Sequence, residues 1–111
     1  MKIPRDVEVY TITPHMHYRG KDMTFSVVGS DGRESTLLRV SKYSPMWQMT
    51  YELASPIELP AGSTIKALAH YDNSAQNRLN PAPDTDVLWG PQSWNEMFHA
   101  FIEASVEAPA R

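Results

Sequence analysis

The spacing of the prolines constrains the fold more than any other feature of the sequence. Nine prolines interrupt the 111 residues, and the longest stretch without one, residues 15–44, is itself broken by the turn formers Ser30-Asp31-Gly32, which leaves little room for long helices. Several stretches between them alternate in polarity or are rich in β-branched and aromatic residues, as strands are. These candidate strands cover residues 7–13, 23–29, 34–40, 47–53 and 63–71. The sequence therefore predicts an all-β protein.

Turn signals separate the candidate strands at regular intervals. Ser30-Asp31-Gly32 lies between two of them and predicts a hairpin, and Ala61-Gly62 predicts a second turn. A short extended piece spans 56–60, and the polar, proline-bearing stretch 72–86 predicts a long loop. This pattern predicts an antiparallel β-sandwich of seven to nine strands with jelly-roll or Greek-key connections.

The C-terminal segment fits two descriptions. Ser93 and Glu96 have the spacing of a helical capping box, and apolar residues follow at helical intervals. A strict alternation in the same segment favours a strand, entered by at most one helical turn. The alternating residues, expected to form one buried sheet face, are Phe98, Ala100, Ile102, Ala104 and Val106.

Length and charge limit the function classes. The length suits a single domain, residues 1–111, and the net charge of -3 offers no basic surface for nucleic acid. No apolar run is long enough to span a bilayer, so we expect no membrane insertion. The N-terminus lacks the apolar segment of a secretory signal, and its abrupt start suggests a domain excised from a longer protein.

The sequence contains no cysteine, so a metal site would need histidine, carboxylate or methionine ligands. His15 and His17 are one residue apart, and on a strand they would share a face. Two imidazoles so placed can bind one ion at about 2.0–2.1 Å. The pattern is common, however, and two solvated histidines at a strand end are the better interpretation of the pair taken alone.

A third ligand would favour a metal site. His70 and His99 are candidates, although His70 fits a partly buried hydrogen-bonding role equally well. Met97 and His99 would share a strand face opposite the apolar run described above. A methionine on that face is unusual, yet a second packed face would also explain it.

Longer stretches of the chain resemble a known family. PHMHYRGKDM at 14–23, AHYDNSAQN at 69–77 and VLWGPQSWNEMFHAFIEA at 87–104 occur in the same order in copper type II ascorbate-dependent monooxygenases. The resemblance is to the C-terminal domain of that family, and particularly to its bacterial relatives. It covers nearly the whole chain.

The resemblance implies a β-sandwich that binds the one copper ion at which oxygen is activated. The implied ligands are His15, His17 and Met97. This set suits copper, because a thioether favours Cu(I) and imidazole serves both oxidation states, whereas zinc prefers harder or anionic ligands. The resemblance also implies ascorbate as reductant, an upstream domain with a second copper, and a periplasmic or extracellular location.

The sequence departs from the family at the substrate side. Peptide-hydroxylating members have an arginine two residues before the first histidine, and an asparagine and a tyrosine shortly after the methionine. Thr13, His99 and Phe101 occupy these positions here. None of them offers the fork that an arginine presents to a carboxylate. We therefore expect His99 and Phe101 to lie near the copper or a small-molecule substrate that is not a peptidylglycine.

Two function classes follow. The first is the oxygen-activating half of a monooxygenase that hydroxylates C–H bonds, inactive as an isolated chain because its electron-supplying domain is missing. The alternative is a non-catalytic copper-binding or interaction module of a larger envelope protein. A third, weaker interpretation is a carbohydrate-binding sandwich that uses Trp47, Trp89 and Trp94.

Overall fold

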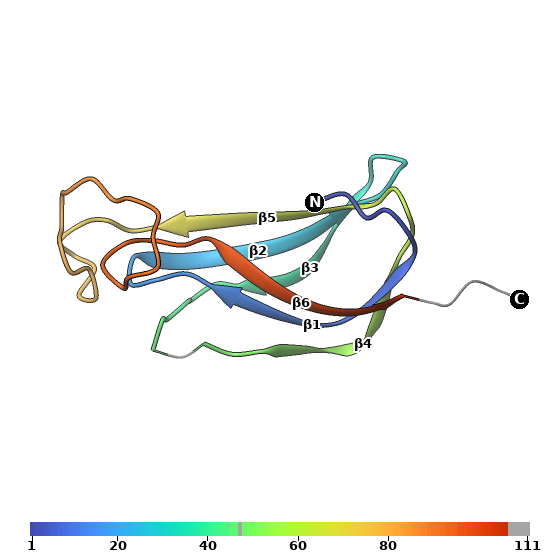
Figure 1. The fold of residues 1–111 in the computed structure, drawn as a ribbon, viewed down its shortest axis with the longest axis horizontal. Helices are drawn as coiled ribbons and strands as arrows, with labels where there is room; N and C mark the ends of the chain where they lie inside the picture. The colour runs from blue at the N-terminus through green and yellow to red at the C-terminus, as the bar shows by residue number, and fades with distance from the viewer. Residues whose placement is uncertain (47, 107–111) are drawn as a thin grey trace, which may run out of the picture.

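The structure is a computed structural model that describes residues 1–46 and 48–106. These residues form six strands and no helix, arranged as two antiparallel three-stranded sheets (Figure 1). The strands are β1 (Val7–His15), β2 (Gly20–Val28), β3 (Glu34–Val40), β4 (Tyr51–Leu59), β5 (Thr64–Tyr71) and β6 (His99–Val106). The strand orders are β4-β1-β6 and β3-β2-β5. The predicted all-β antiparallel sandwich is confirmed, and none of the described residues forms a membrane-spanning helix.

The structure has fewer strands than the seven to nine that the sequence predicts. Pro56 lies inside β4, so the extended piece at 56–60 continues that strand rather than forming another. Residues 87–90 contribute a single bridge, between Trp89 and Glu96, and no strand. Trp47, at the start of a candidate strand, lies outside the described residues.

The predicted hairpin between β2 and β3 is confirmed. The Gly29 N–H donates to the Arg33 carbonyl at 2.8 Å and closes the turn. Gly32 has a φ of 84°, in the left-handed region that favours glycine. The Asp31 side chain accepts a hydrogen bond from the Arg33 N–H at 3.0 Å. The turn residues thus supply the backbone shape and the polar contacts that an antiparallel pair requires.

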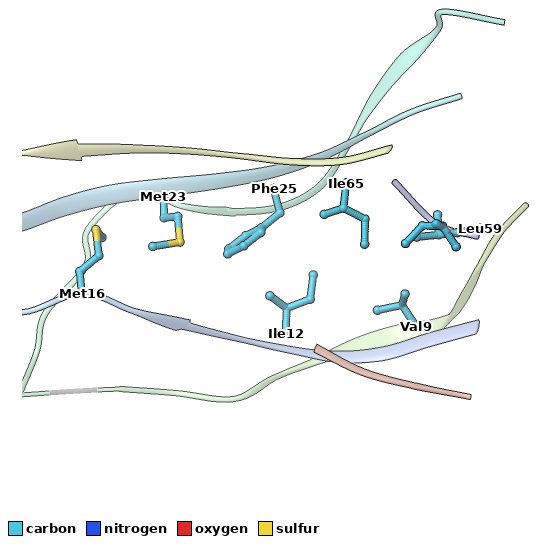
Figure 2. Packing of buried hydrophobic residues seen from close by; sticks show 8 residues of the cluster. Val9, Ile12, Met16, Met23, Phe25, Leu59 and Ile65 are labelled. Carbon is cyan, nitrogen blue, oxygen red and sulfur yellow. The ribbon is translucent and has the colours of Figure 1, made fainter. Parts of the chain in front are cut away.

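The core lies between the two sheets (Figure 2). Its largest fully buried side chain is Phe25 of β2, which is 1% exposed. Figure 2 shows it between residues of both sheets, facing Ile12 of β1. The other members of the buried cluster are Ile3, Val9, Met16, Met23, Leu59 and Ile65. Burial of this apolar surface is the main force that holds the sheets together.

Met16 closes the end of the core nearest the two histidines. Its side chain is 0% exposed, and the Tyr43 hydroxyl donates to its carbonyl at 2.6 Å and accepts from its N–H at 2.9 Å. A Cβ at Gly20 would lie 2.7 Å from the Met16 Cβ, so the glycine permits this close approach. The backbone between the two histidines is thus held in place by Tyr43.

The C-terminal segment is a strand, as predicted, but its alternating face is not buried. Phe98 and Val106 are 47% and 50% exposed, and only Ile102 packs partly against the core. The reason is position: β6 is an edge strand that pairs only with β1. Residues 93–96 form no helical turn either. Alternation predicted the strand correctly, and Ile102 does face the core, but the expectation that the whole of this face is buried is wrong.

Candidate metal centre

The two histidines of the motif meet where β1 ends. His15 is the last residue of β1 and pairs directly with His99, the first residue of β6. His17 lies beyond the strand, next to the turn that leads into β2. The expectation that both histidines share one strand is therefore wrong, although their rings still lie together. The ring centroids are 5.2 Å apart and the rings are nearly perpendicular, at 86°.

This ring spacing fits a shared metal ion. With a metal–nitrogen distance of about 2.0–2.1 Å, two imidazoles on one ion have centroids roughly 5–6 Å apart. Within the described residues, no group of three or more His, Cys, Asp or Glu side chains is arranged to hold a metal. A third protein ligand would have to be of another kind, and a thioether is one.

His17 is oriented by a hydrogen bond of the type that metal-binding histidines use. Its Nδ1 lies 3.0 Å from the carbonyl oxygen of Asn95, and the residue is only 9% exposed. A carbonyl can only accept, so in the neutral ring Nδ1 carries the proton. The Nε2 lone pair is then available to a metal, and the fixed ring orientation favours binding.

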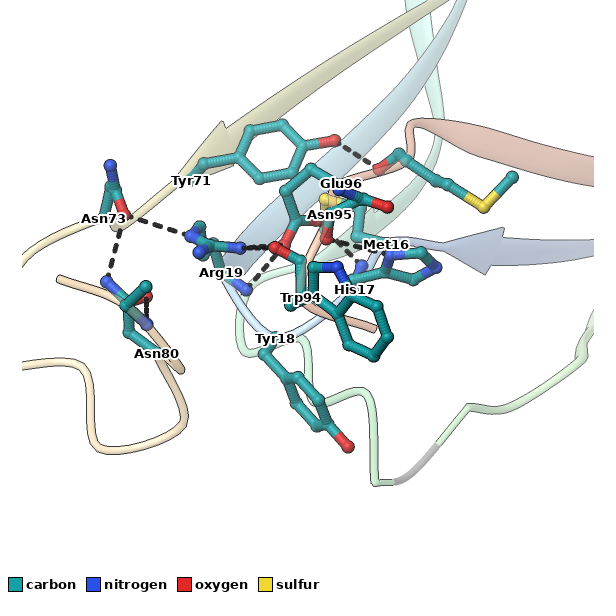
Figure 3. Close-up of polar contacts among 12 residues, drawn as sticks. Met16, His17, Tyr18, Arg19, Tyr71, Asn73, Asn80, Trp94, Asn95 and Glu96 are labelled. Atoms are coloured by element: carbon teal, nitrogen blue, oxygen red, sulfur yellow. Dashed lines mark hydrogen bonds and ion pairs between the residues drawn. The ribbon is translucent and has the colours of Figure 1, made fainter. Parts of the chain in front are cut away.

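A partly buried carboxylate joins the histidine loop to the segment before β6. The Glu96 side chain accepts hydrogen bonds from the N–H groups of His17 at 2.9 Å and Arg19 at 3.0 Å (Figure 3). The Arg19 guanidinium donates to the Trp94 carbonyl at 2.9 Å and lies 3.7 Å from the Glu96 carboxylate. His17 and Glu96 are 79 residues apart in the sequence, so the fold alone brings them together.

The buried arginine is anchored on its other side by the long polar loop. Arg19 is 3% exposed, and its Nε donates to the Asn73 side-chain oxygen at 3.0 Å (Figure 3). The same oxygen accepts from the Asn80 amide at 3.1 Å. A buried charge is costly unless it is paired and hydrogen-bonded, and these contacts meet that requirement. The loop at 72–86 was predicted, but its supporting role was not.

Met97 directly follows the anchored Glu96 and is half-buried. It precedes β6 rather than lying within it, so the expectation that Met97 and His99 share a strand face is wrong. The Tyr71 hydroxyl donates to the Met97 carbonyl at 2.7 Å and fixes the backbone there (Figure 3).

The Tyr71 contact predicts a loss of stability at alkaline pH. Burial, and then the negative charges of Glu96 and Tyr43, raise the pKa of Tyr71 to about 12. In the unfolded chain the Tyr71 hydroxyl loses its proton near pH 10. The contribution of Tyr71 to the free energy of unfolding is therefore complete below about pH 10 and declines as the pH rises toward 12. Urea unfolding between pH 9 and 12 should show this decline. Burial also raises the pKa of Tyr43, so Tyr71→Phe should make the decline shallower without removing it. An unchanged slope in Tyr71→Phe would contradict the assignment.

The positions expected on the substrate side do lie beside the histidines. Thr13 pairs with Phe101 just as His15 pairs with His99, so all four occupy the same outer face of their sheet. The His99 ring lies 6.5 Å from that of His15 and stacks on Trp89 at 6.2 Å. Phe101 is 62% exposed.

His70 lies elsewhere. It is on β5, opposite Asp22 in the other sheet, and its Nδ1 lies 2.6 Å from the Asp22 carboxylate. Of the four histidines, His15, His17 and His99 are therefore the ones whose rings are in contact.

Sequence reasoning missed the residues that support the centre. The Ser93–Glu96 spacing suggested that Glu96 would cap a helix, but its carboxylate binds N–H groups near His17 instead. The only local signal was a charged residue directly before the candidate ligand Met97. Nothing in the sequence identifies Arg19, Asn73 or Asn95 as its partners, because these contacts form only in the folded chain.

Comparison with known proteins places the chain in one family. A search of curated proteins finds no match. Residues 1–103, however, match the family described as copper type II ascorbate-dependent monooxygenase, C-terminal domain. The match includes all the residues of the candidate centre, from the histidine pair to Met97, and extends into β6. The chain therefore belongs to the copper type II ascorbate-dependent monooxygenase family and corresponds to its C-terminal domain.

Proposed function

We propose that this domain binds one copper ion through His15, His17 and Met97 and forms the oxygen-activating half of a monooxygenase. The observation that carries the proposal is the spacing of 5.2 Å between the His15 and His17 ring centroids. Glu96, which directly precedes Met97, is hydrogen-bonded to the His17 backbone. Two imidazoles and one weak thioether suit copper and leave a coordination position for another ligand.

Each proposed ligand is held by a different part of the fold. Strand pairing with β6 holds His15, the Asn95 carbonyl orients His17, and Tyr71 fixes the backbone of Met97. Copper bound there would supply one-electron redox chemistry and a place to activate dioxygen. C–H hydroxylation consumes more electrons than a single Cu(I) holds. We therefore propose an upstream copper domain and ascorbate as electron sources, and we expect the isolated chain not to turn over.

The outer sheet face beside the centre limits the substrate. Thr13, His99 and Phe101 offer no guanidinium to bind a carboxylate, and Phe101 presents an exposed apolar ring. These residues support a small-molecule substrate with an apolar C–H group rather than a peptidylglycine. By its family, the parent protein is proposed to work in the periplasm or outside the cell.

One observation favours the alternative of a non-catalytic interaction module. The edge strand β6 and the segment before it carry Phe98 and Val106, which are 47% and 50% exposed. Exposed apolar side chains on an edge strand suit contact with another protein surface. The carbohydrate-binding interpretation has less support: Trp89 and Trp94 are 68% and 60% exposed, but one ring face of Trp89 stacks on His99.

Replacing Met97 with leucine tests the ligand set. X-ray absorption of the Cu(I)-loaded protein should show nitrogen and sulfur ligands, and Met97→Leu should lose only the sulfur contribution. Met46→Leu is the matched control, since Met46 is 72% exposed and outside the proposed centre. A sulfur contribution that persists in Met97→Leu would show that another group binds the copper.

A further inference from the structure

We propose that Glu96 is a positioning residue that presets His17 and Met97 for copper before the metal binds. The proposal rests on the copper assignment above. It goes beyond that assignment because it concerns a residue that is not a ligand. It also explains how ligands that are distant in the sequence are held close together.

The first support is the way in which the carboxylate holds the turn. Its Oε1 accepts from the His17 N–H and its Oε2 from the Arg19 N–H. The turn itself is closed by the Gly20 N–H, which donates to the His17 carbonyl at 3.1 Å. Two hydrogen bonds prevent the turn from rotating about a single contact. They therefore fix the direction in which the His17 side chain points.

The second support is that Glu96 is itself fixed by another segment. Its N–H donates to the Leu88 carbonyl at 3.0 Å, and its carbonyl accepts from the Gly90 N–H at 3.1 Å. A Cβ on Gly90 would lie 2.5 Å from the Asn95 side chain, so the two segments approach as closely as a glycine allows. Glu96 therefore joins the histidine turn to residues 88–90 in one rigid arrangement.

The third support is the charge balance. Arg19 is 3% exposed and Glu96 is 13% exposed, and their side chains lie 3.7 Å apart. The guanidinium balances the carboxylate charge, and a carboxylate is acceptor-only at both oxygens. Both acceptors are needed, because each oxygen faces a backbone N–H. A glutamine would have nearly the same shape but would turn an NH₂ group toward one of these donors.

The proposed ligands depend on this arrangement to different degrees. Asn95, directly before Glu96, orients the His17 ring, and Met97 directly follows Glu96. His15 is held instead by strand pairing with His99. Loss of the carboxylate should therefore disturb His17 and Met97 while leaving His15 in place.

The test compares Glu96→Gln with Glu103→Gln in the full chain. Glu103 is exposed on β6, so its replacement makes the same chemical change away from the turn. In Glu96→Gln, copper affinity should fall about 10–100-fold, as it does when outer partners of metal ligands are removed. The sulfur contribution to Cu(I) X-ray absorption should also weaken, a change that a purely structural role would not produce. Glu103→Gln should match the unmodified protein.

The outcomes are distinguishable. If the unmodified protein binds no copper, the proposed function fails, and with it the ground for this inference. If the unmodified protein binds copper and folded Glu96→Gln binds it with the same affinity and the same sulfur signal, the inference alone is overturned. If Glu96→Gln does not fold, Glu96→Asp keeps the carboxylate but is one methylene shorter, so it cannot reach both N–H groups. A folded Glu96→Asp with unchanged copper affinity would overturn the inference, and a weakened sulfur signal would support it.

Discussion

Replacing His15 with alanine is expected to weaken copper binding by at least about 100-fold and to leave the domain folded. Changes to outer partners alone cost about 10–100-fold, so loss of a direct nitrogen ligand should cost no less. The remaining imidazole and thioether are too few and too weak to compensate. His15 contributes its backbone to the β1–β6 pairing, and alanine preserves those hydrogen bonds. Competition with a copper chelator would measure the affinity, and far-UV circular dichroism would confirm the fold.

His70→Ala is the matched control for this change. His70 is 61% exposed and bonds Asp22 in the other sheet, so its loss should leave copper affinity unchanged. Met97→Leu should fall between the two, because a thioether is the weakest of the three proposed donors. Equal losses in His15→Ala and His70→Ala would show that copper binds to surface histidines in general, and the assigned centre would be wrong.

The sequence was sufficient for those parts of the fold that depend on local chemistry. The β2–β3 hairpin follows from Asp31 and Gly32, whose backbone preferences are properties of the residues themselves. The face expected to be buried on β6 does turn toward the core at Ile102, which pairs with Ile12, but alternation does not show how much of a face another sheet will cover. At an edge strand the covering is incomplete, and Phe98 stays exposed.

The same distinction applies to the candidate metal centre. His15 and His17 could be recognised because they are close in sequence and share a chemistry. Its unusual place opposite the apolar run made Met97 a candidate, but only the family resemblance selected it as the third ligand, since no local pattern links it to a histidine pair so far away. Glu96 and Arg19 could not have been identified as supporting residues, because their roles consist of side-chain contacts with segments more than about 50 residues away. Local chemistry thus pointed to the histidine pair, while its support depends on the tertiary fold.

The second large effect concerns the core. Phe25→Ala is expected to lower the free energy of unfolding by about 3–5 kcal/mol, the usual cost of deleting a buried aromatic ring. Phe25 is 1% exposed on β2, the central strand of its sheet, and packs against the facing sheet (Figure 2). Domains of this size are stable by only about 5–15 kcal/mol, so the variant would lose a large fraction of its stability. Urea denaturation of metal-free protein would measure the change.

Phe101→Ala deletes the same ring at an exposed site and is the control. Phe101 is 62% exposed, so its replacement should change the free energy of unfolding by no more than about 0.5 kcal/mol. Similar losses in the two variants would mean that the space between the sheets is not the core. None of the proposed copper ligands belongs to the buried cluster, so the core should form without metal. Phe25→Ala protein that is still folded should therefore bind copper with unchanged affinity, and stability and metal binding should vary independently.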